Sequence, residues 1–350
     1  MGYLRFILAV TVLMNHAGKV FGLKYIYPWH MPVMMFFVIS GFYMQLIAKK
    51  YAERKVSDFY ISRVLRIYPL YYFILLASLC SPLIFNLSID QFDLTKAWTE
   101  YFQQLTFLAK SFLIFVNLMI VGQEWTLIFS IGEFGNKFIW DPMQGIHLWT
   151  FLPVGQAWSL SIELLFYLLV PFLWKTSNRA LVWVLIAVMI IHFSVIYFFP
   201  EIYLSGPHRF FPTALRFFIL GMFSARLYDY IHQRLIDKRK LKKYLCITLI
   251  VHIVAMPISY ELSVWLSVFM LPMLFILFKD SKFDKNFGEL SYPIYMSHIL
   301  VLSLVKMIPN LKHQGTVTFL ITLPVSYLLS SYLVAYFDKL RTRYGSGRVV

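Results

Sequence analysis

The sequence predicts an all-α membrane protein, a polytopic bundle of about ten transmembrane helices. The first indication is composition: 59% of the 350 residues are hydrophobic and 14% are charged, against about 45–50% and about 25% in soluble domains. The second is that apolar residues fall in long runs suited to a bilayer. The third is that the net charge of +15 gathers in short loops between these runs, which favours a membrane topology signal over a nucleic-acid-binding surface.

Apolar runs approach the length of about 20 residues that a spanning helix needs. They cover residues 4–22, 31–48, 67–85, 103–121, 158–173, 181–199, 209–226, 244–258, 262–278, 290–308 and 317–336. Basic clusters in 49–66, 226–243, 279–285 and after residue 337 predict cytoplasmic loops and cytoplasmic termini. The segments 86–102, 200–208 and 257–263 contain acidic residues and few or no basic ones, so they are expected outside.

Counting crossings from both ends shows that residues 103–121 cannot be a simple single crossing. Lys110 and Ser111 also interrupt this run. We therefore expect ten spans and an external region at about 86–157, which contains a re-entrant or interfacial segment. No repeat or low-complexity linker divides the chain, so residues 1–350 are expected to form a single domain.

Arg5 and His16 share one face of the first apolar run. A separation of eleven residues at about 100° per residue aligns them and places them about 16 Å apart. Arg5 is then near the cytoplasmic surface and His16 is expected to lie deep in the membrane. The near-neutral pKa of histidine suits a general base, but a histidine bonded to a neighbouring helix would give the same pattern.

Two further elements lie on the second and third runs. Ser40 and Gly41, in FFVISGFYM, would let a backbone or a thin ligand approach closely, although ordinary helix packing explains them too. Arg63 and Arg66 share a helix face at the cytoplasmic start of the third run. Two guanidinium groups there would bind phosphate well, and a simple positive-inside anchor is the alternative.

Glu163 interrupts the apolar segment QAWSLSIELLFYLLVP. Ser159 and Tyr167 lie on the same helix face and could hydrogen-bond its carboxylate. An unpaired carboxylate in a membrane would cost several kcal/mol, so a partner is expected. His16 and Arg216 are the obvious partners, since Arg216 also lies in an apolar run and needs a counter-charge.

Other polar residues could contact a substrate. His298 follows Ser291 by two helical turns and either lines a pore or packs between helices. His30, His208 and Arg209 lie at expected external helix ends. The chain contains no Gly-rich nucleotide loop, no G-x-S-x-G elbow and no H-E-x-x-H motif, so ATP hydrolysis, serine-hydrolase chemistry and a catalytic metal have no support.

Five segments together resemble the acyltransferase 3 family of integral membrane acyltransferases. They are LRFILAVTVLMNH, FFVISGFYM, SRVLRIYPLY, VGQAWSLSIELLFYLLVP and GELSYPIYMSHILV. These segments resemble family elements in the family's order over nearly the whole chain. One departure is HMPVMMFF, where many members have a Gly-rich approach, and no appended hydrolase-like domain is expected.

The resemblance implies a ten-helix bundle in the bacterial inner membrane that transfers an acyl group, commonly acetyl, from cytoplasmic acyl-CoA. The acceptor would be a hydroxyl of an extracytoplasmic or lipid-linked surface glycan, with polysaccharide-assembly proteins as further partners. His16 and Glu163 are the implied catalytic residues. Arg5, Arg63, Arg66, Ser40 and Gly41 are expected to contact the donor. His30, Ser159, Arg216 and His298 are expected to support the acceptor or the site.

A transporter or flippase of a lipid-linked sugar or small metabolite would also explain polar residues inside the bundle. It would move its substrate without chemistry and would not need acyl-CoA. The basic pair Arg63 and Arg66 favours the enzyme, since coenzyme A carries several phosphates. A purely structural scaffold explains none of the charges within the apolar runs.

Overall fold

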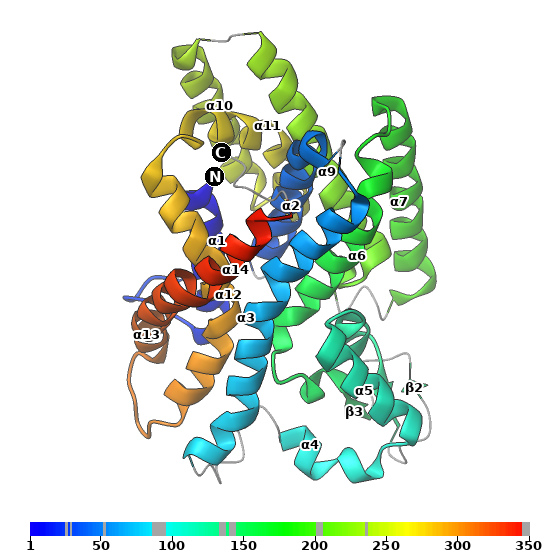
Figure 1. Ribbon diagram of the computed structural model, residues 1–350, viewed down its shortest axis with the longest axis vertical. Coiled ribbons are helices and arrows are strands. Elements are labelled where there is room, and N and C mark those ends of the chain that lie inside the picture. The colour runs from blue at the N-terminus through cyan, green and yellow to red at the C-terminus, as the bar shows by residue number, and fades with distance from the viewer. Residues whose placement is uncertain are drawn as a thin grey trace.

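The computed structural model describes residues 1–24, 27–28, 30–51, 54–85, 96–132, 138–139, 145–200, 206–234 and 237–344. The structure is 82% helical (Figure 1). The α-helices are α1 (Gly2–Ala17), α2 (Met31–Tyr51), α3 (Val56–Phe85), α4 (Lys96–Glu100), α5 (Phe107–Met119), α6 (Trp158–Leu173), α7 (Asn178–Phe198), α9 (Phe211–Gln233), α10 (Lys238–Ala255), α11 (Tyr260–Phe278), α12 (Lys282–Lys306), α13 (Gln314–Leu328) and α14 (Ala335–Thr342).

Every predicted span except 103–121 coincides with a long helix, which confirms the all-α membrane fold. Within the described residues, six helical segments are both long and apolar enough to cross a bilayer. These are Met31–Ala48, Val56–Ser81, Gly155–Leu173, Asn178–Phe198, Tyr260–Phe278 and Gln314–Thr342. The remaining helices of the bundle do not meet both criteria. For example, α1 has only 16 residues, and α10 begins with several charged residues. Ten crossings therefore stay a prediction.

The first and fourth runs differ in length from the ranges expected. Helix α1 ends at Ala17, five residues before the end of the predicted span, because Gly18 adopts a φ of 89° that does not continue an α-helix. The run 103–121 contains only the 13-residue α5, which rises about 20 Å and is too short for a bilayer core of about 30 Å.

The expected external region has a small core of its own. Leu113, Leu148 and Phe151 are buried there, and the Trp98 indole donates to the Phe151 carbonyl (2.9 Å). The region also holds short 3₁₀ turns and a three-stranded antiparallel sheet in the order β2-β1-β3. Its elements are η1 (Phe102–Gln104), η2 (Gln123–Leu127), β1 (Ser130–Ile131), β2 (Phe138–Ile139), β3 (Ile146–His147), η3 (Leu148–Phe151) and η4 (Gly155–Ala157). The expected external residues Asp90 and Asp93 lie outside the described part of the chain.

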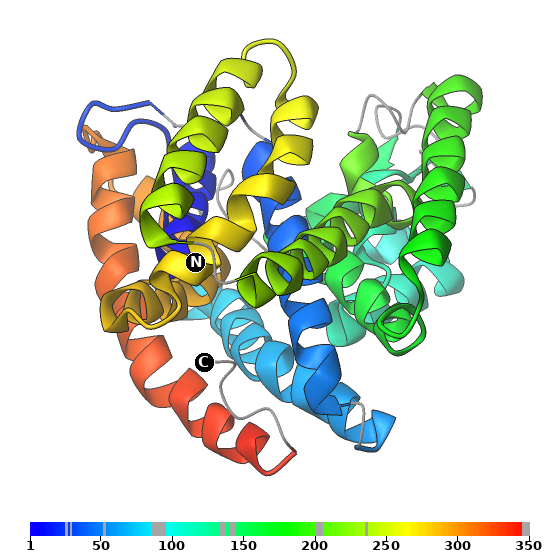
Figure 2. The same cartoon turned by 90° about the horizontal axis from the view of Figure 1, so that it is seen from above.

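Helices α2 and α9 form the closest helix pair near the centre of the molecule. In the view from above, α2 (blue) lies between the orange and red C-terminal helices and the green helices α6 and α7 (Figure 2). A Cβ atom on Gly41 would lie 2.0 Å from the Phe218 carbonyl oxygen, and one on Gly221 would lie 1.9 Å from the Val38 carbonyl oxygen. The two backbones therefore touch where both helices carry glycine.

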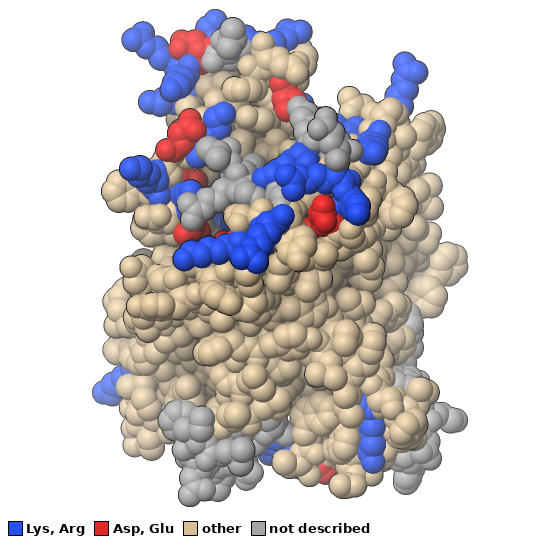
Figure 3. Space-filling view, in the orientation of Figure 1, with Lys and Arg blue, Asp and Glu red and all other residues tan. Residues whose placement is uncertain are grey.

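Charge is distributed unequally along the long axis of the molecule. Lys and Arg side chains crowd the upper end, and the broad middle band is nearly free of charged groups (Figure 3). The small unit of α4 and α5 lies at the opposite, lower end (Figure 1). This is the distribution that a membrane protein with one basic face is expected to have.

Candidate active site

A cavity of about 620 Å³ lies between α1, α2, α3, α6, α12 and α14. Exposed Lys285 and Lys339 line its mouth, and buried Ser159 and Tyr295 line its inner end. The sequence-predicted residues in its wall are Arg5, Ser40, Arg63, Arg66, Ser159 and Glu163. Folding therefore brings these six residues together from four helices.

Basic side chains outnumber acidic ones in the cavity wall. The eight basic residues are Arg5, Lys50, Arg63, Arg66, Lys279, Lys285, Lys339 and Arg341, and the four acidic residues are Glu163, Asp284, Glu289 and Asp338. Charges interact strongly where water is partly excluded, so this wall favours an anionic ligand.

Arg63 is a buried cation, 6% exposed, within this wall. Its guanidinium lies over the rings of Phe59 (5.5 Å) and Tyr167 (5.8 Å) and donates to the Ser62 hydroxyl (2.9 Å). Among the described residues no carboxylate pairs with Arg63, and its buried Nε has no hydrogen-bond partner. A buried cation without a counter-ion is costly, so Arg63 is suited to bind a phosphate group of a ligand.

Glu163 is held by two hydroxyl groups. Ser40 (2.6 Å) and Tyr167 (2.5 Å) both donate to Oε1, which confirms Tyr167 as a partner. The expected bond from Ser159 is wrong, because the Ser159 hydroxyl is hydrogen-bonded to the Tyr295 hydroxyl (2.6 Å) instead. No hydrogen bond to Oε2 is found in the described part of the chain, so this oxygen can meet a ligand in the cavity.

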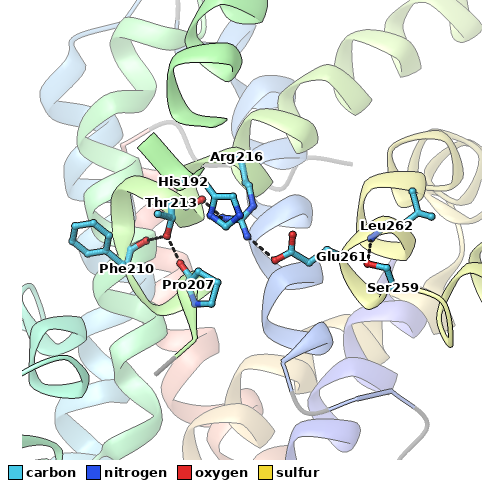
Figure 4. Close-up of polar contacts among 8 residues, drawn as sticks. All are labelled: His192, Pro207, Phe210, Thr213, Arg216, Ser259, Glu261 and Leu262. Carbon is cyan, nitrogen blue, oxygen red and sulfur yellow. Dashed lines mark hydrogen bonds and ion pairs between the residues drawn. The ribbon is translucent and has the colours of Figure 1, made fainter. Parts of the chain in front are cut away.

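Arg216 does not pair with Glu163, so that expectation is wrong. Its guanidinium is fully buried and donates to Glu261 (2.8 Å) and to the Thr213 carbonyl (2.5 Å), with His192 Nδ1 at 3.2 Å (Figure 4). Glu261, in the first turn of α11, lies beside Arg216 and supplies the counter-charge. Arg216 is absent from the cavity wall and joins α7, α9 and α11.

Gly41 does not line the cavity either. The expected contact with the donor is therefore not supported, whereas the alternative of close helix packing is confirmed. Gly41 faces α9, where the missing side chain is needed, and the neighbouring Ser40 faces Glu163.

His16 and His298 form a pair beyond the inner end of the cavity. Their ring centroids are 5.3 Å apart, and the His298 ring lies 5.9 Å from the Tyr295 ring. The His16 side chain is exposed, and α1 ends one residue later. Its expected depth in the membrane stays a prediction. His298 is fully buried, and its Nδ1 contacts the Tyr295 carbonyl (2.8 Å), while Nε2 has no hydrogen-bond partner among the described residues. Neither histidine lines the cavity.

A second cluster, here called the Arg209 cluster, consists of His30, Trp158, His208 and Arg209. The His208 ring lies 4.3 Å from that of His30 and 5.9 Å from that of Trp158, and the Arg209 guanidinium is 5.6 Å from the Trp158 ring. Burial, followed by the charges of His30 and Arg209, lowers the pKa of His208 well below its usual range, so the imidazole is neutral. Burial and the Arg209 charge lower the pKa of His30 to about 4. Trp29 and Glu201, nearby in sequence, lie outside the described residues.

Among the cavity residues that sequence reasoning missed are Tyr295 and Arg341. Tyr295 precedes His298 by one helical turn, so the shared helix face could have identified it. Arg341 resembled any other cytoplasmic charge, and nothing in the sequence showed that α14 folds back against α3. No group of side chains suited to hold a metal ion occurs in the described ranges.

The comparison with known proteins identifies the family of the chain. The family model of the acyltransferase 3 family, described as an acyltransferase domain, matches residues 1–336. No curated protein and no solved structure matches the chain. The matched residues include both members of the histidine pair and all helices that line the cavity except most of α14, which continues to Thr342. The chain belongs to the acyltransferase 3 family and is a membrane acyltransferase.

Proposed function

We propose that the protein transfers an acyl group, in our assignment acetyl, from cytoplasmic acyl-CoA to a hydroxyl of an extracytoplasmic or lipid-linked surface polysaccharide. The observation that carries this proposal is the basic cavity. It begins at the basic end of the molecule and ends one side-chain layer from the histidine pair.

The donor is inferred from the chemistry of the cavity wall. Coenzyme A carries several phosphates and a long flexible arm that ends in the thiol. Arg63 and Arg66, with Arg5, supply guanidinium groups for phosphates, and Arg63 has no acidic partner in the described ranges. The arm would then pass Ser40 and Glu163, whose Oε2 can accept a hydrogen bond from an amide N–H of the arm.

The reaction would use His16 as general base. His16 takes the proton of the acceptor hydroxyl while the oxygen attacks the thioester carbonyl, and the carbon–sulfur bond then breaks. The thiolate of coenzyme A leaves and takes up a proton, so no other reagent is needed. His298 would support His16: its Nδ1 is directed to the Tyr295 carbonyl, which leaves the lone pair of Nε2 for a neighbouring donor.

Ser159 and Tyr295 separate the donor cavity from the histidine pair. Their mutual hydrogen bond (2.6 Å) closes the inner end of the cavity. We expect this bond to open when the thioester arrives, so that acyl transfer occurs without a continuous water-filled path through the membrane.

The orientation in the membrane follows from charge. The basic end would face the cytoplasm, where acyl-CoA is made, and the α4–α5 unit would lie outside. We propose the bacterial inner membrane as the location, with both ends of the chain in the cytoplasm.

The proposal is tested by mass spectrometry of the surface glycan from cells with and without the gene. The glycan should gain one acetyl mass per modified site only when the wild-type gene is present. The variants His16→Ala and Glu163→Gln should reach the membrane in normal amount and leave the glycan unmodified. Wild-type acylation in either variant would refute its assignment as catalytic.

Purified protein in lipid discs separates the enzyme from a transporter. The enzyme should bind coenzyme A and release it from acetyl-CoA only when acceptor is present. Movement of a lipid-linked sugar without coenzyme A release would instead support the transporter.

A further inference from the structure

The Arg209 cluster lies at the junction of three segments. Arg209 and His208 belong to the short 3₁₀ turn η5 (Pro207–Arg209), Trp158 begins α6, and His30 directly precedes α2. The backbone of Gly206 adopts a φ of 101°, and a Cβ atom there would lie 2.7 Å from the His208 ring. Glycine therefore allows this turn to place His208 against Trp158.

Arg209 is a partly buried cation without an acidic partner in the described ranges. Arg216 and Arg341, which are more buried than Arg209, have carboxylates at 2.8 Å and 3.1 Å. In the part of the chain that the structure describes, the Arg209 guanidinium lies against the face of Trp158, and its buried Nε has no hydrogen-bond partner. The buried Nε2 of His208, a side chain that is 1% exposed, has none either.

The cluster is also connected by contacts to the proposed catalytic base. Trp158 directly precedes Ser159, whose hydroxyl is hydrogen-bonded to Tyr295 (2.6 Å). The Tyr295 ring lies 5.9 Å from that of His298, which pairs with His16. A ligand group bound by Arg209 would therefore lie near the inner end of the donor cavity, beside which the histidine pair also lies. The donor cavity does not include Arg209, so this group belongs to the other substrate.

We propose that Arg209, His208 and Trp158 form a subsite for an anionic group of the acceptor, and that the acceptor is therefore acidic near its reactive hydroxyl. The guanidinium binds the oxyanion, the neutral His208 can donate or accept one hydrogen bond, and Trp158 offers an apolar surface to a sugar ring. The anion is either the carboxylate of an acidic sugar or a phosphate of a lipid-linked carrier. This inference rests on the proposed function, which supplies the donor cavity, the acceptor and its reactive hydroxyl.

The test measures binding without turnover. Full-length protein in lipid discs is saturated with coenzyme A, which blocks the basic cavity, and is titrated with glucuronate, pyrophosphate or glucose. Wild-type protein should bind one of the anions better than glucose. Arg209→Gln should weaken that binding about 10- to 100-fold, the loss expected for one charge-assisted contact. Stronger binding of glucuronate indicates a sugar carboxylate, and stronger binding of pyrophosphate indicates a lipid-linked phosphate.

Two controls separate a binding role from a general charge effect or misfolding. Arg179→Gln removes an exposed positive charge elsewhere and should leave anion binding unchanged. Arg209→Lys keeps the charge and should retain part of the binding, with unchanged affinity for coenzyme A. Equal anion binding by wild type and Arg209→Gln, or no preference of the wild type for an anion, would overturn the inference. If anion binding depends on Arg209 but acetyl-CoA is never turned over, only the proposed function fails.

Discussion

At the residue scale, the strongest functional signals are charged side chains that the fold buries without an opposite charge. Within the described residues, Arg63 is such a residue in the donor cavity, and Glu124 is one in the expected external region. Arg216 shows the contrasting case, since Glu261 satisfies it and it supports helix packing. Burial with a partner therefore indicates structure, and burial without one indicates a ligand or a shifted pKa.

Arg63→Ala should weaken the binding of acyl-CoA about 10- to 100-fold, because one charged hydrogen-bonding group is lost from a site that excludes much of the water. Arg63→Lys should recover only part, since an ammonium lacks the planar fork. The measurement is the KM for acetyl-CoA and calorimetric titration with coenzyme A. Arg54→Ala, at an exposed position outside the cavity, is the matched control. An unchanged KM in Arg63→Ala would remove Arg63 from the donor site.

Glu124 should make stability depend on pH. It is 1% exposed, and burial raises its pKa above the usual 4.5, with the Ser161 hydrogen bond opposing the rise. A pKa higher in the folded than in the unfolded chain means that ionisation opposes folding. The contribution is favourable below about pH 4.5 and is lost as pH rises through the folded pKa.

Glu124→Gln should remove this pH dependence and raise the melting temperature at neutral pH. The measurement is the difference in melting temperature between wild type and variant at each pH from acidic to neutral. Groups that titrate equally in both proteins cancel in this difference. Glu100→Gln, at an exposed position, should melt like the wild type at each pH. Parallel pH profiles for Glu124→Gln and wild type would contradict the assignment.

At the element scale, the contact of α2 with α9 determines where Ser40 meets Glu163. Gly41→Ala or Gly221→Ala would push a Cβ atom into a backbone carbonyl of the opposite helix. Such overpacking costs about 1–3 kcal/mol, and the shift of α2 should also displace Ser40 from Glu163. We expect a lower melting temperature together with a loss of acylation.

Gly155→Ala is the control for this effect, because no atom of the described ranges lies within 4 Å of a Cβ atom at this position. It should keep both stability and activity. If Gly41→Ala were as stable and active as Gly155→Ala, the close approach of the two helices would not matter for the site.

The sequence was sufficient for the elements but not for all contacts between them. Apolar runs located the helices because each run must bury its surface or face lipid, and the break at Lys110 correctly indicated the short α5. The predicted Glu163–Arg216 pair was wrong. Both residues needed a partner within the apolar runs, but their distance cannot be read from the sequence. The sequence predicted Glu261 in an external loop, whereas the first turn of α11 brings it to Arg216. The end of α1 was missed because only the backbone of Gly18 reveals it.

At the scale of the whole molecule, the charge distribution and the position of the cavity indicate the same orientation in the membrane. The basic end holds the mouth of the cavity, and the opposite end holds the α4–α5 unit. An acyltransferase with its donor in the cytoplasm and its acceptor outside requires this polarity. The same polarity fixes which exposed positions an impermeant reagent can reach.

Thiol labelling in cells tests the topology directly. After Cys80 and Cys246 are replaced by serine, a membrane-impermeant maleimide should label Thr99→Cys in intact cells. It should label Lys175→Cys and Lys240→Cys only after the inner membrane is opened, because α6 is expected to cross and α10 to begin in the cytoplasm. All three positions are exposed, so accessibility within the fold is not the variable. Labelling of Lys240→Cys in intact cells would place the basic end outside, where acyl-CoA is absent, and the proposed direction of transfer would fail.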